Sequence, residues 1–350
     1  TPDPAPVGGT PGPVGGTPDP GPGGPADADG DGFVATDGDC DDSERSVNPM
    51  AVEVEGNGRD DDCDGATDEA PEPCDCAAGA ALPAGLDLCD PRFLLSWEER
   101  FVAPRGETAA GLSTHYGTPG NGLAVRSGCA YTVLATAPVD TEGCTWWEPE
   151  WCEESPRQPG IDFYDDGMDR FCGEGGIPGE VDPNPAGPDE ADVCDVHQIV
   201  LHLRVPSNAI GFSFDFVYLS TEYPEWVNQG YNDTFYAIID RPAAGELRNI
   251  SYDDAGHEIE VDNAFFEDPP RTDLSGTGYD GTCTSDRDYT RAVCGSSTGW
   301  LRTSWTVTPG EELTLTLSIH DEGDGFLDSA VLLDGFTWSP GEVTPGTDLI

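Results

Sequence analysis

The chain has 350 residues, of which 68 are acidic and 15 are basic, so its formal charge at neutral pH is −53. All of the basic residues are arginine, and the 45 glycines and 32 prolines exceed the usual share of these two residues. Such a dense negative charge repels nucleic-acid phosphates and acidic lipid head groups, so neither is an expected partner. Divalent cations are the natural counter-charge.

The sequence favours an exported protein. It contains no apolar run near the about 20 residues that span a bilayer, so membrane insertion is not expected. It begins Thr1-Pro2-Asp3-Pro4 without a leader sequence, as a mature product would. The 12 cysteines include no zinc-type Cys-x-x-Cys pair. We therefore predict disulfides and a secreted or cell-surface location.

Residues 1–25 form a Pro/Gly/Thr-rich extension with a near-repeat, Pro4–Pro11 followed by Pro11–Pro18. Proline removes backbone donors and glycine is costly to order, so this segment cannot build a core. One interpretation is a flexible or polyproline spacer. The other is a segment that a neighbouring copy of the protein holds in place.

Residues 26–76 form an acidic block with 18 Asp and Glu against Arg45 and Arg59, a net charge of −16. Its first stretch, Asp27–Phe33, places carboxylates at alternate positions before a glycine, and this spacing wraps oxygen ligands around a hard cation. An EF-hand loop starting at Asp27 would have Gly38 at its twelfth position, where that motif needs glutamate, so this is not an EF-hand. Asp37 and Asp39 bracket that position.

A second acidic stretch follows, with Gly38–Asp42, Asn48-Pro49, Glu53, Asn57–Gly65 and Asp68-Glu69 in order. The block resembles the Asp-rich metal-binding motif of bacterial surface proteins, and this resemblance implies a Cys40–Cys63 disulfide. We expect the block to bind two or three calcium ions. Without metal, the carboxylates would repel one another and the block would unfold. The alternative is a disordered acidic tract. The candidate metal ligands are Asp27, Asp29, Asp31, Phe33, Asp37, Asp39, Asp41, Asp42, Glu53, Asn57, Asp61, Asp62, Asp64 and Asp68.

From about residue 90 the sequence becomes typical of β-structure. Aromatic residues alternate along 212–218, as in a half-buried strand, and leucines alternate along 313–319. Further strands are predicted at Ile199–Val205, Thr234–Asp240 and Ala330–Trp338. We expect an all-β, antiparallel sandwich or jelly roll.

Acidic residues also gather in three segments of this region, Ser220–Trp226, Asn232–Phe235 and Asp321–Ser329. Together with the aromatic strand, they resemble the choice-of-anchor L domain of bacterial surface proteins over residues 92–338. Loops of a sandwich could bring their oxygens to one further calcium ion, although turn chemistry alone is the alternative explanation. The candidate ligands are Glu222, Asn232, Asp233, Asp321, Asp324 and Asp328.

A local disulfide is expected between Cys283 and Cys294. The other eight cysteines allow 105 pairings, and the sequence does not choose among them; they are Cys74, Cys76, Cys89, Cys129, Cys144, Cys152, Cys172 and Cys194. No catalytic motif is present, and the histidines show no clear metal-ligand spacing, so we do not expect an enzyme.

The expected organisation is an extension (1–25), an acidic calcium module (26–76), a Cys-containing linker (77–91), the β domain (92–340) and a tail (341–350). The leading hypothesis is a calcium-stabilised subunit of an extracellular filament or matrix, joined head-to-tail to other copies through its extension. The alternative is a monomeric, calcium-dependent adhesin that binds surface glycans through Glu222, Asp233 and nearby aromatic residues. A hydrolase with an unrecognised carboxylate pair is a third hypothesis.

Overall fold

The computed structural model describes most of the acidic block and the β region. The described residues are 26–77, 80–101, 110–116, 123–136, 172–173, 193–224, 227–228, 233–266, 273–274, 277, 279, 295–322 and 329–350. The chain divides into two compact units, which we call the first unit (Thr1–Glu69) and the β unit (Ala70–Ile350). The N-terminal extension lies outside the described residues.

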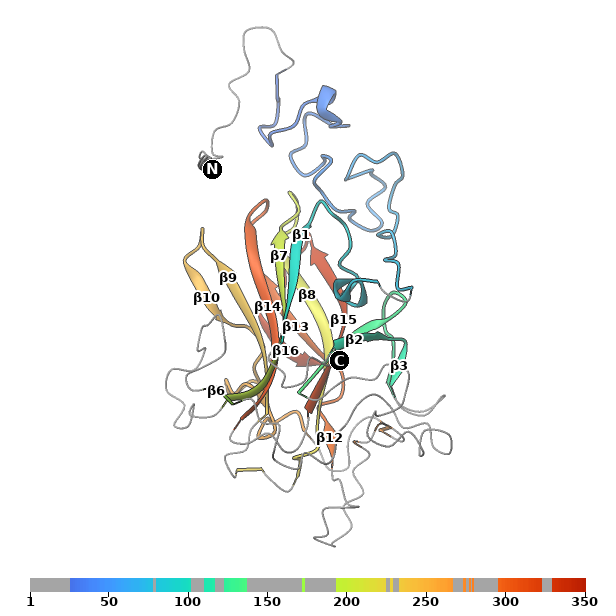
Figure 1. Ribbon diagram of the computed structural model, residues 1–350. Coiled ribbons are helices and arrows are strands. Elements are labelled where there is room, and N and C mark those ends of the chain that lie inside the picture. Colours follow the sequence, from blue (N-terminus) through green and yellow to red (C-terminus); the bar gives the residue numbers. More distant parts are fainter. Residues whose placement is uncertain are drawn as a thin grey trace, which may run out of the picture. The chain divides into compact units, whose positions relative to one another are not determined.

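Two antiparallel sheets contain nearly all of the described strands of the β unit (Figure 1). Sheet A has the strand order β1-β7-β14-β9-β10, with β11 added to β9 and β6 added to β7. Its strands are β1 (Leu94–Phe101), β6 (Cys172–Gly173), β7 (Val193–Arg204), β9 (Thr234–Arg241), β10 (Glu246–Asn249), β11 (Ile259–Glu260) and β14 (Glu312–Glu322).

Sheet B has the order β16-β13-β8-β15-β5-β2, with β12 added to β8. Its strands are β2 (Ala110–Ser113), β5 (Tyr131–Ala135), β8 (Gly211–Ser220), β12 (Ser296–Ser297), β13 (Leu301–Thr306), β15 (Ser329–Ser339) and β16 (Gly346–Leu349). A small third sheet pairs β3 (His115–Tyr116) with β4 (Leu123–Ala124), and the 3-10 helices are η1 (Ala35–Asp37) and η2 (Leu82–Leu86).

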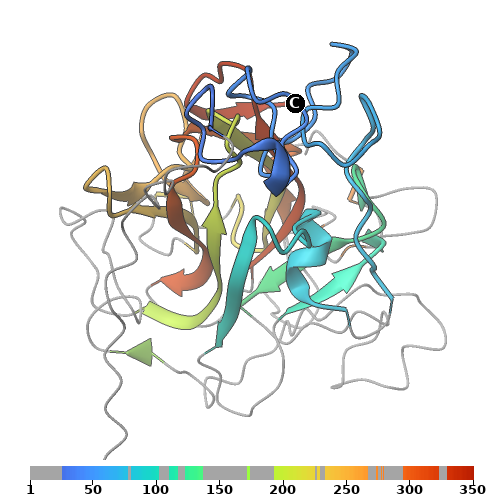
Figure 2. The ribbon, with the colours of Figure 1, turned by 90° about the horizontal axis from the view of Figure 1, so that it is seen from above.

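The core lies between the two sheets, as in a sandwich (Figure 2). Sheet A contributes alternate residues such as Leu201 and Leu317, and sheet B contributes Phe214 and Phe216. The Phe216 and Phe235 rings, one from each sheet, have centroids 5.0 Å apart. Alternation along each strand therefore puts one face of each sheet into a shared apolar layer, which confirms the expected all-β class.

The five strands predicted from the sequence all exist, and β8, β14 and β15 extend beyond both of their predicted ends. Strand β7 begins earlier than predicted but ends at Arg204, one residue before its predicted end, and β9 begins at the predicted Thr234. The expectation of a half-buried strand at 212–218 was wrong, because β8 is buried on both faces. Val217 and Leu219 point away from the core between the sheets and join a second apolar cluster with Leu123, Tyr131 and Leu274. Segments distant in sequence thus cover the outer face of sheet B at this end.

Two disulfides fix the start of the β unit, and one of them reaches the segment before β5 of sheet B. Cys74 pairs with Cys89, and Cys76 pairs with Cys129, which lies two residues before the start of β5. Between them, η2 packs against β5, and the Thr132 hydroxyl donates to the Leu82 carbonyl oxygen at 2.5 Å. The backbone register also places Cys172 of β6 opposite Cys194 of β7. Cys144, Cys152 and the expected Cys283–Cys294 bridge lie outside the described residues.

Candidate metal centre

The first cluster of the first unit is formed by Asp27, Asp29 and Asp31. Each of them offers a carboxylate oxygen within 4.8 Å of the others. The loop is built by its own side chains, since Asp27 accepts hydrogen bonds from the backbone N–H groups of Gly30 (2.6 Å) and Gly32 (3.1 Å). Gly30 and Gly32 have φ of 79° and 100°, which only glycine adopts without strain. The alternating Asp-Gly pattern therefore turns the carboxylates toward one point.

The second cluster consists of two overlapping triads, Glu53–Asp62–Glu69 and Asp60–Asp62–Asp64. Asp62 belongs to both triads and is only 8% exposed. Glu53 holds the loop together, because its Oε1 accepts from the backbone of Asp61 at 2.7 Å and its Oε2 accepts from that of Asp68 at 2.8 Å. Side chains from two separate stretches of chain thus converge on one acidic site.

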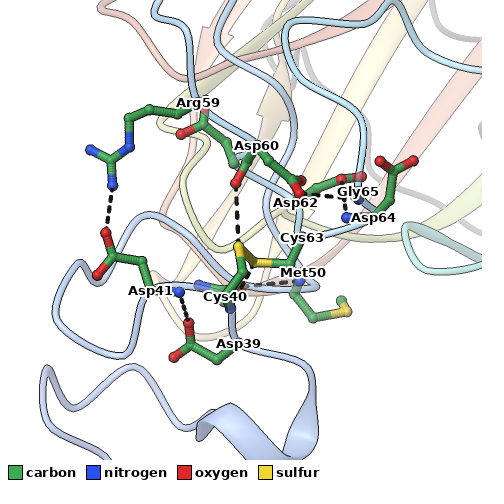
Figure 3. Close-up of a disulfide and its surroundings, with 12 residues drawn as sticks. Asp39, Cys40, Asp41, Met50, Arg59, Asp60, Asp62, Cys63, Asp64 and Gly65 are labelled. Atoms are coloured by element: carbon green, nitrogen blue, oxygen red, sulfur yellow. Dashed lines mark hydrogen bonds and ion pairs between the residues drawn. A yellow bond between two sulfur atoms is a disulfide. The ribbon is translucent and has the colours of Figure 1, made fainter.

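A disulfide between Cys40 and Cys63 joins the stretch of Asp39 and Asp41 to the stretch of Asp60, Asp62 and Asp64, with a sequence separation of 23. Figure 3 shows Asp39 and Asp41 on one side of this bridge and Asp60, Asp62 and Asp64 on the other. An exposed ion pair of 3.5 Å between Arg59 and Asp41 spans the same two stretches. The pairing is the one that the family resemblance implies.

The clusters hold more negative charge than their described surroundings neutralise. Within the described part of the first unit, four buried carboxylate oxygens find no hydrogen-bond donor: Asp29 Oδ2, Asp39 Oδ2, Asp60 Oδ1 and Glu69 Oε2. Burial raises the pKa of Asp29, and the charges of Asp31 and Asp27 raise it further. For Glu69, a backbone hydrogen bond lowers the pKa, but burial and the charge of Glu53 outweigh it and raise the pKa overall. Bound cations would relieve this repulsion.

Several of the predicted ligands shape the loops instead of joining a cluster. Asp61 accepts from the Val54 backbone at 3.0 Å and from the Asn57 amide at 2.6 Å, and Asp68 accepts from the Asn57 backbone at 2.9 Å. Asp42 accepts from the Ala28 backbone at 3.3 Å. The Phe33 backbone donates to Asp31 at 2.7 Å.

The remaining predicted ligands lie around the Cys40–Cys63 bridge and at η1. Asp41 accepts from the Ser43 hydroxyl at 2.6 Å, while Asp39 is buried and receives the Asp41 backbone N–H at 2.8 Å. Asp37 lies in η1.

The sequence interpretation left out Asp60 and Glu69, which the structure places in the second cluster. Asp60, Asp62 and Asp64 repeat the alternate spacing of Asp27, Asp29 and Asp31, and that repeat was the available signal for Asp60. For Glu69 the sequence carries no comparable signal, because its contribution depends on the turn made by the loop.

The β unit brings Glu222, Asp233 and Asp321 together from the ends of β8, β9 and β14. All three are buried. The Asp233 backbone donates to Glu222 Oε2 at 3.4 Å, and the Ser329 hydroxyl donates to Asp233 Oδ2 at 2.5 Å. The Tyr218 hydroxyl donates to the Asp233 carbonyl oxygen at 2.6 Å. Asn232, Asp324 and Asp328 lie outside the described residues.

The three carboxylates also act on Tyr218 electrostatically. Burial raises the pKa of Tyr218 well above its ordinary value, and the charges of Asp233 and Glu222 add to the effect. Asp321 contributes in the same direction. The three segments picked out in the sequence therefore meet in one buried, negatively charged place.

Two stretches of the chain match known families. Residues 189–338 match the family model described as "Choice-of-anchor L domain", and residues 39–69 match the one described as "Putative metal-binding motif". Both resemblances read from the sequence are thereby confirmed, although the domain match begins at residue 189 rather than 92. No curated protein sequence matches the chain.

Among solved structures, the chain is similar to the K3 cleaved adhesin domain of Lys-gingipain from Porphyromonas gingivalis w83. The two are 12% identical, and the alignment covers 68% of this chain and 91% of that one with a TM-score of 0.21, which is too low to carry an argument. In the part of the chain that the structure describes, no helix has the length and apolar character to cross a bilayer. The family matches indicate a cell-surface or extracellular protein.

Proposed function

We propose that this protein is a calcium-stabilised structural protein of the cell surface, a subunit of an extracellular filament or matrix. The observation that carries the proposal is the first unit, which contains two carboxylate clusters and a disulfide that ties the second cluster's stretch to Cys40. The matches to a surface-protein domain and to a metal-binding motif support a role that is structural rather than catalytic.

The donor set of the first unit favours calcium over softer metals. Its clusters offer only carboxylate oxygens, residues 1–69 contain no histidine, and Cys40 and Cys63 are tied up in a disulfide. Copper and zinc prefer nitrogen and sulfur ligands, whereas calcium takes six to eight oxygens. The two clusters support two or three ions, and the buried carboxylates of Glu222, Asp233 and Asp321 support one more in the β unit.

Calcium titration tests the metal assignment. Isothermal titration of chelator-stripped protein should show calcium binding, with much weaker responses to magnesium and none that is specific to copper. In Asp62→Asn, which removes a carboxylate shared by both triads, calcium affinity should fall at least tenfold. Asp37→Asn is the matched control, because Asp37 lies in η1 outside both clusters. Preferential copper binding, or an unaffected Asp62→Asn variant, would overturn the assignment.

In the proposed assembly, the Pro/Gly-rich extension of one copy binds the next copy and the contact repeats head-to-tail. The proposal draws on the composition of residues 1–25, which gives them no core of their own. A pre-extended polyproline segment would bind at a low entropic cost.

Negative-stain electron microscopy of natively secreted protein in millimolar calcium tests the assembly. We expect regular filaments, which disappear when residues 1–25 are deleted while the β unit keeps its unfolding transition. Filaments that persist after the deletion would refute the proposal that residues 1–25 form the contact between copies. Dispersed particles of the intact chain would refute the filament and lead next to glycan-binding measurements.

A further inference from the structure

Asp334 on β15 is a wholly buried carboxylate with only one side satisfied. Its exposed fraction is 0%. Its Oδ2 accepts from the backbone N–H groups of Arg126 at 2.7 Å and Ser127 at 3.4 Å. Its Oδ1 is also buried, and no described group donates a hydrogen bond to it. A buried carboxylate oxygen in this state needs a cation or a proton.

A second carboxylate, that of Asp87, lies against the turn 126–128, whose backbone also contacts Asp334. Asp87 ends η2 with φ of 59°, and its Oδ2 is buried without a hydrogen-bond donor among the described residues. The turn 126–128 links the two acids, because Arg126 and Ser127 contact Asp334 while Gly128 packs against Asp87. A Cβ at position 128 would come within 2.1 Å of Asp87 Oδ1, so only glycine fits there.

The nearby guanidinium groups are directed to another carboxylate. A row of charged residues crosses sheet B in register, in the order Asp348, Arg302, Asp215, Asp334. Arg302 Nε lies 2.6 Å from Asp215 Oδ1, and Arg126 Nε lies 3.2 Å from Asp215 Oδ2. Asp215 thus forms ion pairs with both arginines. The negative charges of Asp334, at the end of the row, and of the neighbouring Asp87 are not neutralised by these two arginines.

The surrounding chain is rigidly fixed. The Cys74–Cys89 disulfide closes two residues after Asp87, and the Cys76–Cys129 disulfide closes one residue after Gly128. Helix η2 also contacts β15. Burial raises the pKa of Asp334, and the charge of Asp87 raises it further, so the two carboxylates lie near each other. The disulfides limit how far the loops beside them can move to relieve this repulsion. Such pre-organisation is what a metal site requires.

We propose that Asp87 and Asp334 bind a hard divalent cation, calcium in an extracellular setting, at a site separate from the clusters of the first unit and from Glu222, Asp233 and Asp321. The unsatisfied oxygens Asp87 Oδ2 and Asp334 Oδ1 are its protein ligands. Water and backbone carbonyls complete the coordination, as is common for calcium. The site does not depend on the metal proposal for the first unit.

Counting bound ions in the full-length chain tests the site. Equilibrium dialysis against radioactive calcium gives the number of ions per chain at saturation. We expect Asp334→Asn and Asp87→Asn each to lose one ion, and the double variant to lose no more than either single variant. Asp348→Asn is the matched control, because it removes an exposed carboxylate from the same row and should leave the count unchanged.

Unchanged ion counts in both single variants would overturn the proposal. Asp87→Asn keeps the test decisive if Asp334→Asn does not fold, since Asp87 is only half-buried. Loss of calcium from Asp62→Asn with no loss from Asp87→Asn would refute this site alone. The converse result would refute only the site in the first unit.

Discussion

The β unit buries aliphatic and aromatic side chains from two sheets in a continuous core, whereas the described part of the first unit buries only Val47 and Ala51 among its apolar residues. What the first unit buries instead is polar, including Asp39, Asn48, Asp61 and Asp62. The β unit is therefore stabilised by removing apolar surface from water, whereas the proposed function requires the first unit to depend on cations that neutralise its concentrated negative charge. Removal of metal should therefore destabilise the first unit, and a core substitution should destabilise the β unit.

The largest expected effect is that of removing metal. In EGTA, the carboxylates of the first unit lose their counter-ions and the unit should unfold, while the β-sheet signal in circular dichroism persists. Limited trypsin digestion reports this directly, because Arg45 and Arg59 are the only tryptic sites in residues 26–76. Cleavage at both should rise at least tenfold in EGTA. Equal protection with and without calcium would show that charge neutralisation does not hold the unit together.

A core substitution tests the other side of the comparison. Phe216 is fully buried and contacts Phe235 across the sandwich. Phe216→Ala should lower the free energy of unfolding of the β unit by about 4 kcal/mol, as expected for a large core cavity. Chemical denaturation measures this loss. The calcium concentration that protects Arg45 and Arg59 from trypsin should not change, and a shift in it would mean that the units are not independent.

Removing the Cys40–Cys63 disulfide should have a somewhat smaller effect. Cys40→Ser with Cys63→Ser releases a loop of 23 residues, which costs about 3 kcal/mol through the unfolded state. More calcium should then be needed to protect the first unit from trypsin. The matched control is Cys74→Ser with Cys89→Ser, which removes a disulfide of the β unit. A control that raised the calcium requirement equally would contradict a local role for Cys40–Cys63.

The smallest effect concerns an acid that is fully satisfied by hydrogen bonds. Burial raises the pKa of Asp253, but N–H donors from His257 and Ala255 outweigh it and lower the pKa overall. Because the pKa of Asp253 is lower in the folded chain than its unfolded value of about 3.8, ionised Asp253 stabilises the fold at a pH above that unfolded value. This stabilisation is lost as the pH falls through the pKa of the folded state. Asp253→Asn should cost about 1 kcal/mol at pH 7.

Denaturation of wild type and Asp253→Asn across pH checks the sign, since their difference should shrink below pH 4. Asp254→Asn, on an exposed neighbour, is the control. A difference that grew toward acid would reverse the argument. The contrast with Asp29, whose pKa is raised, is that Asp253 faces donors and Asp29 faces other carboxylates.

The sequence predicted those features that depend on local spacing. Alternation located β8 and β14, and the Asp-Gly repeat located Asp27, Asp29 and Asp31. It did not distinguish neighbours in Asp60-Asp61-Asp62, where the turn points Asp61 back to Val54 and leaves Asp60 and Asp62 in the cluster.

Features that depend on tertiary contacts were beyond the sequence. Cys74 and Cys76 are two residues apart but pair with Cys89 and Cys129, because η2 docks beside β5. Likewise, only the folded chain shows that Tyr131 and Leu274 cover the outer face of β8.

Asp62 is shared by both triads of the second cluster, and this sharing has a consequence for how the first unit responds to calcium. Ions that share a ligand in a unit that needs them to fold cannot bind independently, because the first to bind organises the loop for the next. We therefore expect a steep, cooperative response with a Hill coefficient above one. The first unit would remain unfolded where free calcium is scarce, as inside a cell, and would fold on reaching a calcium-rich exterior.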